Sequence, residues 1–224
     1  MAIQLRNTRD VHVSGVKFLV YGSAGAGKTS LIPTLPDPII LSAEGGLLSI
    51  NGTDTPYIEI ADMASLLDAY KWLTESDEAK QFASVALDSI SEIGEVVLNA
   101  EKKKTKDPRQ AYGAMNEQMA DLIRAFRDLS GKHVYMTAKL DKQQDEQGRL
   151  LYSPSMPGKS AGMSLPYMFD EVYALRVEKD AEGNLVRALM TQPDGLWLAK
   201  SRGKLDAWEA PDLGAIIAKI GGAK

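Results

Sequence analysis

The chain has 224 residues, of which 44% are hydrophobic and 25% charged, a composition typical of a globular protein with a buried core. It has no cysteine and two histidines, which excludes disulfides and thiolate chemistry and disfavours a histidine metal site, so we expect an intracellular, cytoplasmic protein. The formal net charge of −4 disfavours a generally basic surface, and no apolar run is long enough to predict a membrane span.

The first predicted elements are a buried strand over 16–21 and a glycine-rich segment directly after it. Residues 22–29 read Gly-Ser-Ala-Gly-Ala-Gly-Lys-Thr and match G-x-x-x-x-G-K-[ST] at every position. In this phosphate loop (P-loop), backbone N–H groups surround the β-phosphate, Lys28 reaches the β- and γ-phosphates, and the Thr29 hydroxyl holds Mg²⁺. A helix starting at 29–32 would add its positive end, although Pro33 and Pro36 would cut it short. A glycine-rich turn without a ligand is the alternative. The predicted ATP-binding residues are Gly22, Ser23, Ala24, Gly25, Ala26, Gly27, Lys28, Thr29 and Ser30.

A second strand is predicted over 38–42, and Glu44 follows it beside two glycines. Because the carboxyl ends of parallel strands meet at one edge of a sheet, we expect Glu44 to face the same crevice as the P-loop. A carboxylate there can orient and deprotonate the water that attacks the γ-phosphate. The alternative is an exposed glutamate in a turn.

A helix capped by Asp62 comes next, and then a buried strand over 83–87 that ends in Asp88. Mg²⁺ usually takes one or two protein oxygens besides phosphates and waters, so Thr29 and Asp88 would suffice as its protein ligands. The alternative is that Asp88 is only a turn residue. The inward-facing positions are predicted to be Met63, Leu66, Leu67, Tyr70 and Leu73 in the first helix, and Ile90, Ile93, Val97 and Ala100 in the helix after Asp88.

The clearest helix spans about 110–130, where Tyr112, Met115, Met119 and further apolar residues recur at helical spacing, a stripe that core packing explains better than a ligand site. The segment 101–109 before it is expected to be a mobile loop that could follow a phosphate backbone. A solvated charged surface is the alternative. The cations of this segment are Lys102, Lys103, Lys104, Lys106 and Arg109.

A strand is predicted over 133–137, after which glycines and prolines between 140 and 166 indicate a flexible loop or a small hairpin around 147–148. Basic and aromatic side chains here could meet phosphates or stack on a base, although three acidic neighbours count against this. The candidate DNA contacts are Lys142, Arg149, Tyr152 and Lys159, and the acidic neighbours are Asp141, Asp145 and Glu146.

The last predicted elements are strands over 171–177, 185–191 and 196–200, with a turn at 180–184, and a closing helix over 211–220. Strands and helices alternate along most of the chain, which favours a mostly parallel central sheet with helices on both faces. The final strands predict an antiparallel extension of that sheet. We therefore expect one α/β domain over 1–224, with residues 1–14 as an N-terminal arm.

Three segments resemble those of RecA-type recombinases. Ser-Ala-Glu-Gly-Gly-Leu at 42–47 resembles their strand-end glutamate segment, and Val-Ala-Leu-Asp-Ser-Ile at 85–90 resembles their second nucleotide motif. The pair Lys200-x-Arg202 is similar to a late pair that reaches the neighbouring subunit's ATP site. The resemblance spans about 16–220, and within the group the chain looks most like phage-encoded RecA-like nucleotide-binding proteins of the Sak-type single-strand annealing group.

The resemblance implies a RecA-like P-loop core with Glu44 as the residue that activates water. Lys200 and Arg202 would act in trans on the γ-phosphate, as arginine fingers do, and a solvated strand end is the alternative. The glutamine with which RecA senses the γ-phosphate is replaced by Thr-Ala-Lys at 137–139. The family also implies a ring or filament of identical subunits on single-stranded DNA, a single-stranded-DNA-binding protein as a partner, and a phage or prophage origin in a bacterial host. Its two DNA loops would fall at 101–109 and 140–166.

Three functions follow as hypotheses. The first is a DNA-dependent ATPase that acts in recombination or annealing. The second is a single-strand annealing protein in which ATP switches assembly and hydrolysis is slow or dispensable. The third is a small-molecule kinase, which the sequence disfavours because it has no arginine-rich lid segment.

Overall fold

The computed structural model describes residues 15–222, except for the side chains of residues 159–161, 163 and 222. The predicted arm at 1–14 lies outside the described residues. The strands are β1 (Lys17–Gly22), β2 (Pro38–Ser42), β3 (Tyr57–Glu59), β4 (Ser84–Asp88), β5 (His133–Gln144), β6 (Leu150–Ser155), β7 (Glu171–Lys179), β8 (Leu185–Met190) and β9 (Trp208–Glu209). The α-helices are α1 (Met63–Glu75), α2 (Ile90–Lys104), α3 (Pro108–Arg127), α4 (Lys159–Met168) and α5 (Leu213–Gly222), and short 3-10 helices span Thr29–Thr34, Leu47–Ile50 and Glu78–Gln81.

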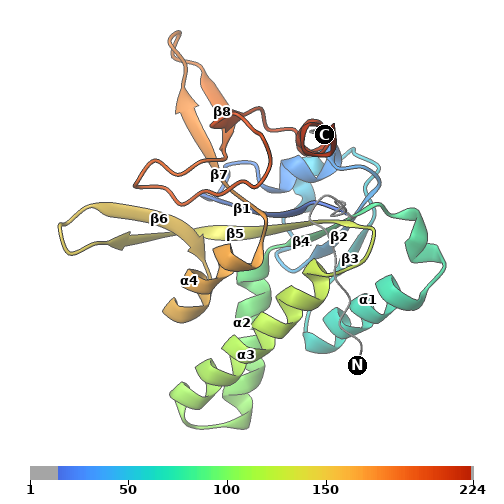
Figure 1. The fold of residues 1–224 in the computed structure, drawn as a ribbon. Coiled ribbons are helices and arrows are strands. Elements are labelled where there is room, and N and C mark those ends of the chain that lie inside the picture. The colour runs from blue at the N-terminus through green and yellow to red at the C-terminus, as the bar shows by residue number, and fades with distance from the viewer. Residues whose placement is uncertain (1–14, 223–224) are drawn as a thin grey trace, which may run out of the picture.

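Within residues 15–222, all nine strands join one sheet in the order β3-β2-β4-β5-β1-β7-β8-β9, with β6 paired to β5 (Figure 1). The strands from β3 to β7 run parallel to their neighbours in that order. The pairings of β6, β8 and β9 are antiparallel. The expected α/β class is confirmed, with a mostly parallel centre and an antiparallel extension at the C-terminal side.

Both faces of the sheet are buried at β1. The continuous apolar run of β1 is typical of a strand that is covered on both sides. Leu19 and Tyr21 pack on one face among residues of α1 to α4. Phe18 and Val20 pack on the other face with α5 and the 3-10 helix Thr29–Thr34. The central strand β1 is therefore packed between two hydrophobic cores. This packing holds the carboxyl end of β1, where the next loop begins, in a fixed position.

The predicted helices are confirmed, with small differences in which residues face inward. Asp62 accepts a hydrogen bond from Ser65 N (2.8 Å), and the Ser65 hydroxyl accepts one from Asp62 N, so the cap of α1 is a full capping box. Met115 and Met119 are buried in α3, as expected of a core stripe. Leu67 was wrongly predicted to face inward and is 57% exposed, because Ala69 and Leu73 continue the buried stripe instead.

The stretch 140–166 is more regular than the flexible loop that the sequence suggested. β5 continues to Gln144 and returns as β6 through a turn at 145–148, where Gly148 has a φ of 81°. The hairpin alternative is therefore correct. A helix, α4, follows although Pro166 lies within it. Residues 196–200 were predicted to form a strand but make only two isolated bridges, between Trp197 and Tyr152 and between Lys200 and Val172.

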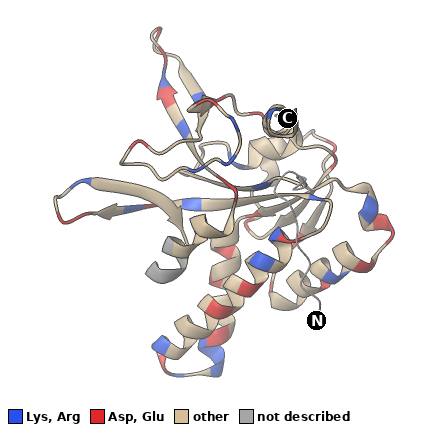
Figure 2. Ribbon diagram, in the orientation of Figure 1, with Lys and Arg blue, Asp and Glu red and all other residues tan. Residues whose placement is uncertain are grey.

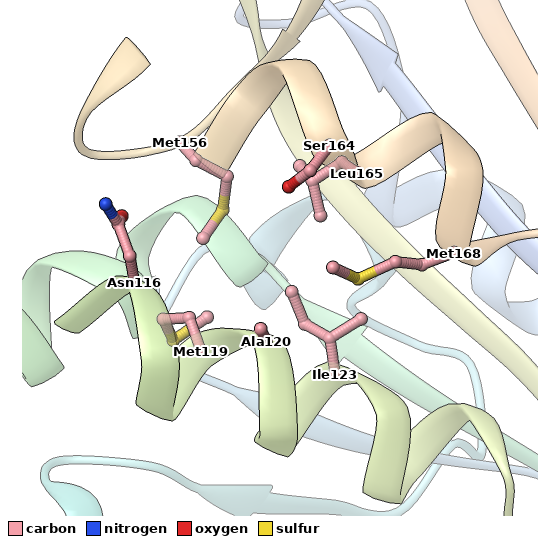
Figure 3. A pocket seen from close by; sticks show the side chains of 8 residues that line it. All are labelled: Asn116, Met119, Ala120, Ile123, Met156, Ser164, Leu165 and Met168. Carbon is pink, nitrogen blue, oxygen red and sulfur yellow. The ribbon is translucent and has the colours of Figure 1, made fainter. Parts of the chain in front are cut away.

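The helix α4 packs against α3 and leaves a pocket of about 200 Å³ between them (Figure 3). Its lining is apolar and rich in methionine, including Met119, Met156 and Met168, and contains no charged side chain. Within the described residues, no helix is both long enough and apolar enough to cross a bilayer.

Candidate nucleotide site

The P-loop starts at the end of the central strand, since Gly22 is the last residue of β1. The positive φ angles of Gly25 (74°) and Gly27 (102°) form the turn, a conformation that residues with a Cβ rarely adopt. The loop leads into a six-residue 3-10 helix rather than the expected α-helix start, because Pro33 lies within the segment. The contribution of a helix dipole to anion binding is correspondingly smaller than the sequence suggested.

The Lys28 side chain folds back over the loop. Its Nζ donates hydrogen bonds to the carbonyl oxygens of Gly22 (2.9 Å) and Ser23 (3.1 Å). Burial lowers the pKa of Lys28, and Lys139 lowers it further, while Glu44 and Asp88 oppose this shift. A half-buried ammonium group gains from a nearby phosphate, so the loop is electrostatically suited to an anion.

The buried carboxylate of Asp88, at the end of β4, is hydrogen-bonded both to the 3-10 helix after the P-loop and to β5. The Thr29 hydroxyl donates to its Oδ2 (2.7 Å), and the Thr137 hydroxyl donates to its Oδ1 (2.5 Å). A hydroxyl that donates its proton to a carboxylate keeps its lone pairs for another partner. Thr29 and Asp88 thus present two hard oxygen groups of the kind that Mg²⁺ prefers. Among the described residues, no group of three or more His, Cys, Asp or Glu side chains could hold a metal ion.

Glu44 lies at the same edge of the sheet, as the parallel-strand argument expected. β2 and β4 are neighbours with Ser42 opposite Asp88, and Ala43 N donates to Asp88 O (2.8 Å). The exposed Glu44 side chain accepts a hydrogen bond at Oε1 from the Ser89 hydroxyl (2.5 Å). This hydrogen bond fixes Oε1 and so orients the whole carboxylate. Oε2 is then the oxygen that could accept a proton from water, as a water-activating base must.

Two side chains that hold the P-loop were not identified from the sequence. The Tyr135 hydroxyl, buried in β5, donates to Lys28 O (2.8 Å). Arg187 of β8 donates from Nε to Ala26 O (2.9 Å), and a Cβ on Gly27 would lie 3.1 Å from that Nε. Gly27 is therefore favoured by its positive φ, and a Cβ there would also crowd the Arg187 side chain. Tyr135 follows the apolar pattern of a core strand, and Arg187 lies in the exposed first half of β8, so neither carried a sequence signal.

Two of the residues 137–139, which replace the RecA glutamine, have different contacts: Thr137 bonds to Asp88, and Lys139 contacts the first turn of α2. Thr137 holds Asp88, as described above. The Lys139 side chain forms an ion pair with Glu92, and its backbone N donates to the Ser91 hydroxyl (2.9 Å). Thr137 could have been found from the sequence by the strand-end argument that found Asp88, because β5 lies between β4 and β1.

Lys200 and Arg202 lie at the opposite edge of the sheet from the P-loop of the same chain. Lys200 is bridged to Val172, near the start of β7, and its Nζ donates to Pro166 O (3.1 Å) and Phe169 O (2.6 Å). The exposed Arg202 pairs with Asp170 (2.5 Å). The hydrogen bonds of both side chains thus go to residues 166–170 and not to residues 22–29 of the described chain, and a role in another subunit stays a prediction.

The predicted DNA-contacting cations are exposed but are not in a mobile loop. Lys102, Lys103 and Lys104 form the last turn of α2, and Arg109 lies in the first turn of α3, so only residues 105–107 connect the helices. Figure 2 shows these basic residues at the tip where α2 and α3 meet. Cations at a helix C-terminus also satisfy the helix dipole, which is a structural reason for the three lysines.

The second group of candidates lies on the β5–β6 hairpin and α4. Lys142 and Tyr152 are opposite each other, with the Lys142 Nζ 5.9 Å from the centre of the Tyr152 ring. Arg149 pairs with Asp145 (2.7 Å) across the turn, so its charge is already compensated. Lys159 begins α4, and its side chain lies outside the description.

A P-loop at the end of the central strand, with Asp88 on the strand beyond β5, defines a P-loop nucleotide-binding protein. The chain belongs to the AAA domain family, which it matches over residues 14–203. Among solved structures it is similar to a KaiC-like protein from the hyperthermophilic archaeon Pyrococcus horikoshii OT3. The two share 12% identity over 79% of this chain and 77% of that one, with a TM-score of 0.43. No curated protein matches the chain.

The Thr137–Asp88 contact gives a first prediction. Thr137→Val keeps the shape of the side chain but leaves Asp88 Oδ1 without its hydroxyl donor. Losing one hydrogen bond to a buried charged group costs about 1.5–3 kcal/mol, so we expect lower stability and weaker Mg²⁺-dependent ATP binding. Urea unfolding and ATP titration with and without Mg²⁺ measure both effects. Thr137→Ser is the control, and equal behaviour of the Val and Ser variants would contradict the assigned role.

Proposed function

We propose that the protein hydrolyses ATP with Mg²⁺ at this site and assembles on single-stranded DNA in phage-type recombination or strand annealing. The observation that carries the ATPase part is the meeting of the P-loop with Glu44 and Asp88 at one sheet edge, each carboxylate fixed by a hydroxyl. Lys28 would bind the phosphates, and Glu44 would take the proton of the attacking water. Mg²⁺, when bound, would neutralise phosphate charge beside Thr29 and Asp88.

The DNA part of the proposal is supported by the resemblance to RecA-type recombinases and by the exposed cations at the α2–α3 tip. A protein with a net charge of −4 needs such a local patch to attract a phosphate backbone. Lys104 is partly committed, since it pairs with Glu101 (2.6 Å). Lys103, Lys106 and Arg109 are exposed, and we assign them most of the phosphate contact.

We also propose that subunits share the ATP site. The side-chain hydrogen bonds of Lys200 and Arg202 go to residues 166–170 and not to the P-loop of their own chain, so we assign their proposed role to a second copy. Arg202 is the better suited of the two, because its guanidinium is 65% exposed and held only by a surface pair with Asp170. Lys200 is occupied by two backbone carbonyls. A ring or filament is the assembly that such head-to-tail contacts form.

One experiment tests the whole proposal. ATP hydrolysis is measured without DNA, with single-stranded DNA and with duplex DNA, each at two salt concentrations. We expect turnover that single-stranded DNA stimulates more than duplex, with a stimulation that falls as salt rises. Binding of ATP and DNA without turnover would instead favour an annealing protein that uses ATP as an assembly switch.

The α2–α3 tip gives a second prediction. Replacing Lys102, Lys103, Lys104 and Lys106 with Gln is expected to weaken single-stranded DNA binding and to flatten its salt dependence, by up to about one slope unit per lost phosphate contact. Fluorescence anisotropy over a salt series measures the slope. The control replaces Lys71 and Lys80, two exposed lysines on other elements. A salt slope equal to wild type would reduce the tip to a solvated charged surface.

A further inference from the structure

The two strands beside β1 extend beyond the P-loop. β1 ends at Gly22, opposite Lys139, whereas β5 continues to Gln144 and β7 to Lys179. The β5–β6 and β7–β8 hairpins therefore project on either side of the loop (Figure 1). Between them lies a pocket of about 440 Å³, lined by residues 23–26 of the P-loop and by side chains of both hairpins, including Lys142, Tyr152 and Arg176.

One wall of this pocket is a stack of aromatic rings and cations. The rings of Tyr152 and Trp197 lie 4.2 Å apart and 10° from parallel. The Arg176 guanidinium lies 4.9 Å from the centre of the Trp197 ring and 5.0 Å from that of the Trp208 ring. The Lys142 Nζ lies over the Tyr152 ring, and this exposed lysine pairs with no carboxylate in the described part of the chain.

We propose that this pocket, here called the stacking pocket, binds a base of single-stranded DNA, which stacks on Tyr152 while Lys142 moves to the adjoining phosphate. The inference rests on the proposed function and adds the place and the chemistry of recognition. Every base has a π-face, so an aromatic platform binds single strands with little sequence preference. Lys142 lies on the strand next to Tyr152, within reach of a phosphate attached to a stacked base.

The charges around the pocket favour stacking of a DNA base over contacts with a series of DNA phosphates. Arg176 is paired with Glu178 and lies 3.5 Å from Asp194, so its positive charge is largely compensated. Lys142 is left as the uncompensated cation of the wall. Binding here should therefore depend on the base, and only weakly on salt, in contrast to binding at the α2–α3 tip.

The stacking pocket adjoins the ATP site, because its lining includes residues 23–26 of the P-loop, whereas Lys28, Thr29 and Asp88 lie outside it. It is also joined to the P-loop through β1. The Tyr21 hydroxyl, one residue before Gly22, donates to Tyr152 O (3.1 Å) and to Leu198 O (2.6 Å). A ligand that moves Tyr152 would therefore act, through this hydrogen bond, on β1, the strand that leads into the P-loop.

The test compares Tyr152→Leu with Tyr152→Phe, which keeps the ring. Each is titrated against labelled oligodeoxythymidine and against an abasic oligomer of equal length, by anisotropy at two salt concentrations. We expect Tyr152→Leu to lose about tenfold or more in affinity for the normal oligomer, as the removal of one stacking partner does, with an unchanged salt slope. Tyr152→Phe should match wild type. Wild type should bind the abasic oligomer as weakly as Tyr152→Leu does.

The outcomes separate this inference from the proposed function. If wild type binds no single-stranded DNA, the DNA part of the proposed function fails and the inference fails with it. If wild type binds but does not distinguish normal from abasic strands, the inference alone is wrong, whatever the folding of the variants. Tyr152→Leu could instead bind DNA normally and tripolyphosphate normally, but ATP more weakly than wild type does. That result would overturn the inference and assign the pocket to the base of ATP.

Discussion

Glu44→Gln is expected to abolish ATP turnover while ATP binding stays close to wild type. The amide has nearly the shape of the carboxylate and can still accept the hydrogen bond from Ser89, but it cannot take a proton from water. Positioned general bases contribute about 10²–10⁴-fold to rate, so kcat should fall by that order. Steady-state hydrolysis and equilibrium binding of ATP, measured on the same preparation, separate the two effects.

Two further variants make this result specific. Glu59→Gln alters another exposed glutamate at the end of a strand, since Glu59 closes β3 opposite Ser42 of β2, and it should hydrolyse ATP normally. Ser89→Ala removes the donor that orients Glu44 and should lower kcat more than it raises KM. Retention of full activity in Glu44→Gln would remove Glu44 from the mechanism and leave Asp88 or the substrate phosphate as the base.

The residues at the carboxyl edge of the sheet were predictable because all strands of a parallel sheet run in the same direction. A buried apolar run followed by a charged residue places that residue at the carboxyl edge, and all such edges coincide in a parallel sheet. This argument located Glu44 and Asp88 from the sequence, and the register of Ser42 against Asp88 agrees with it. The same argument applies to Thr137, which ends the predicted strand 133–137 and lies on the strand between β4 and β1.

Other parts of the site could not be predicted, because they depend on contacts between distant segments. Arg187 reaches Ala26 across 161 residues, and no local pattern links them. The hydroxyls that orient the two carboxylates belong to residue types common at any strand end. The stacking pocket exists because β5 and β7 outrun β1, and strand length is where sequence patterns are least informative.

The errors at the level of elements have a common cause. The glycines and prolines at 148, 154, 157, 158 and 162 predict breaks in regular structure, but Gly148 lies in the hairpin turn, Pro154 lies within β6, and α4 starts after Gly158 and contains Gly162. The cations at 101–109 indicated a loop by charge density, whereas α2 simply continues through Lys104, where its C-terminus favours positive charge. Composition described these segments correctly as polar and exposed, yet did not determine their backbone conformation.

Lys28→Ala is expected to remove most of the affinity for ATP. The ammonium lies over the carbonyls of Gly22 and Ser23, where it is half buried and beside the sheet edge that holds Glu44 and Asp88. With alanine at 28, the phosphates lose this cation while the carboxylates of Glu44 and Asp88 remain close to the loop, so binding of an anion is disfavoured. A charge-assisted hydrogen bond contributes about 1.5–3 kcal/mol, which corresponds to roughly 10–100-fold in Kd.

Calorimetric titration of ATP with Mg²⁺ measures this loss, and Lys71→Ala is the matched control because Lys71 is an exposed lysine on α1. Lys28→Arg separates charge from geometry. The larger, planar guanidinium cannot replace a compact ammonium within a close-fitting loop, so affinity should stay low although the charge is kept. Loss in both Lys28 variants with a normal Lys71 variant is the expected pattern. Unchanged ATP binding in Lys28→Ala would mean that nucleotide binds elsewhere, and the roles of Glu44 and Asp88 would fall with that of the loop.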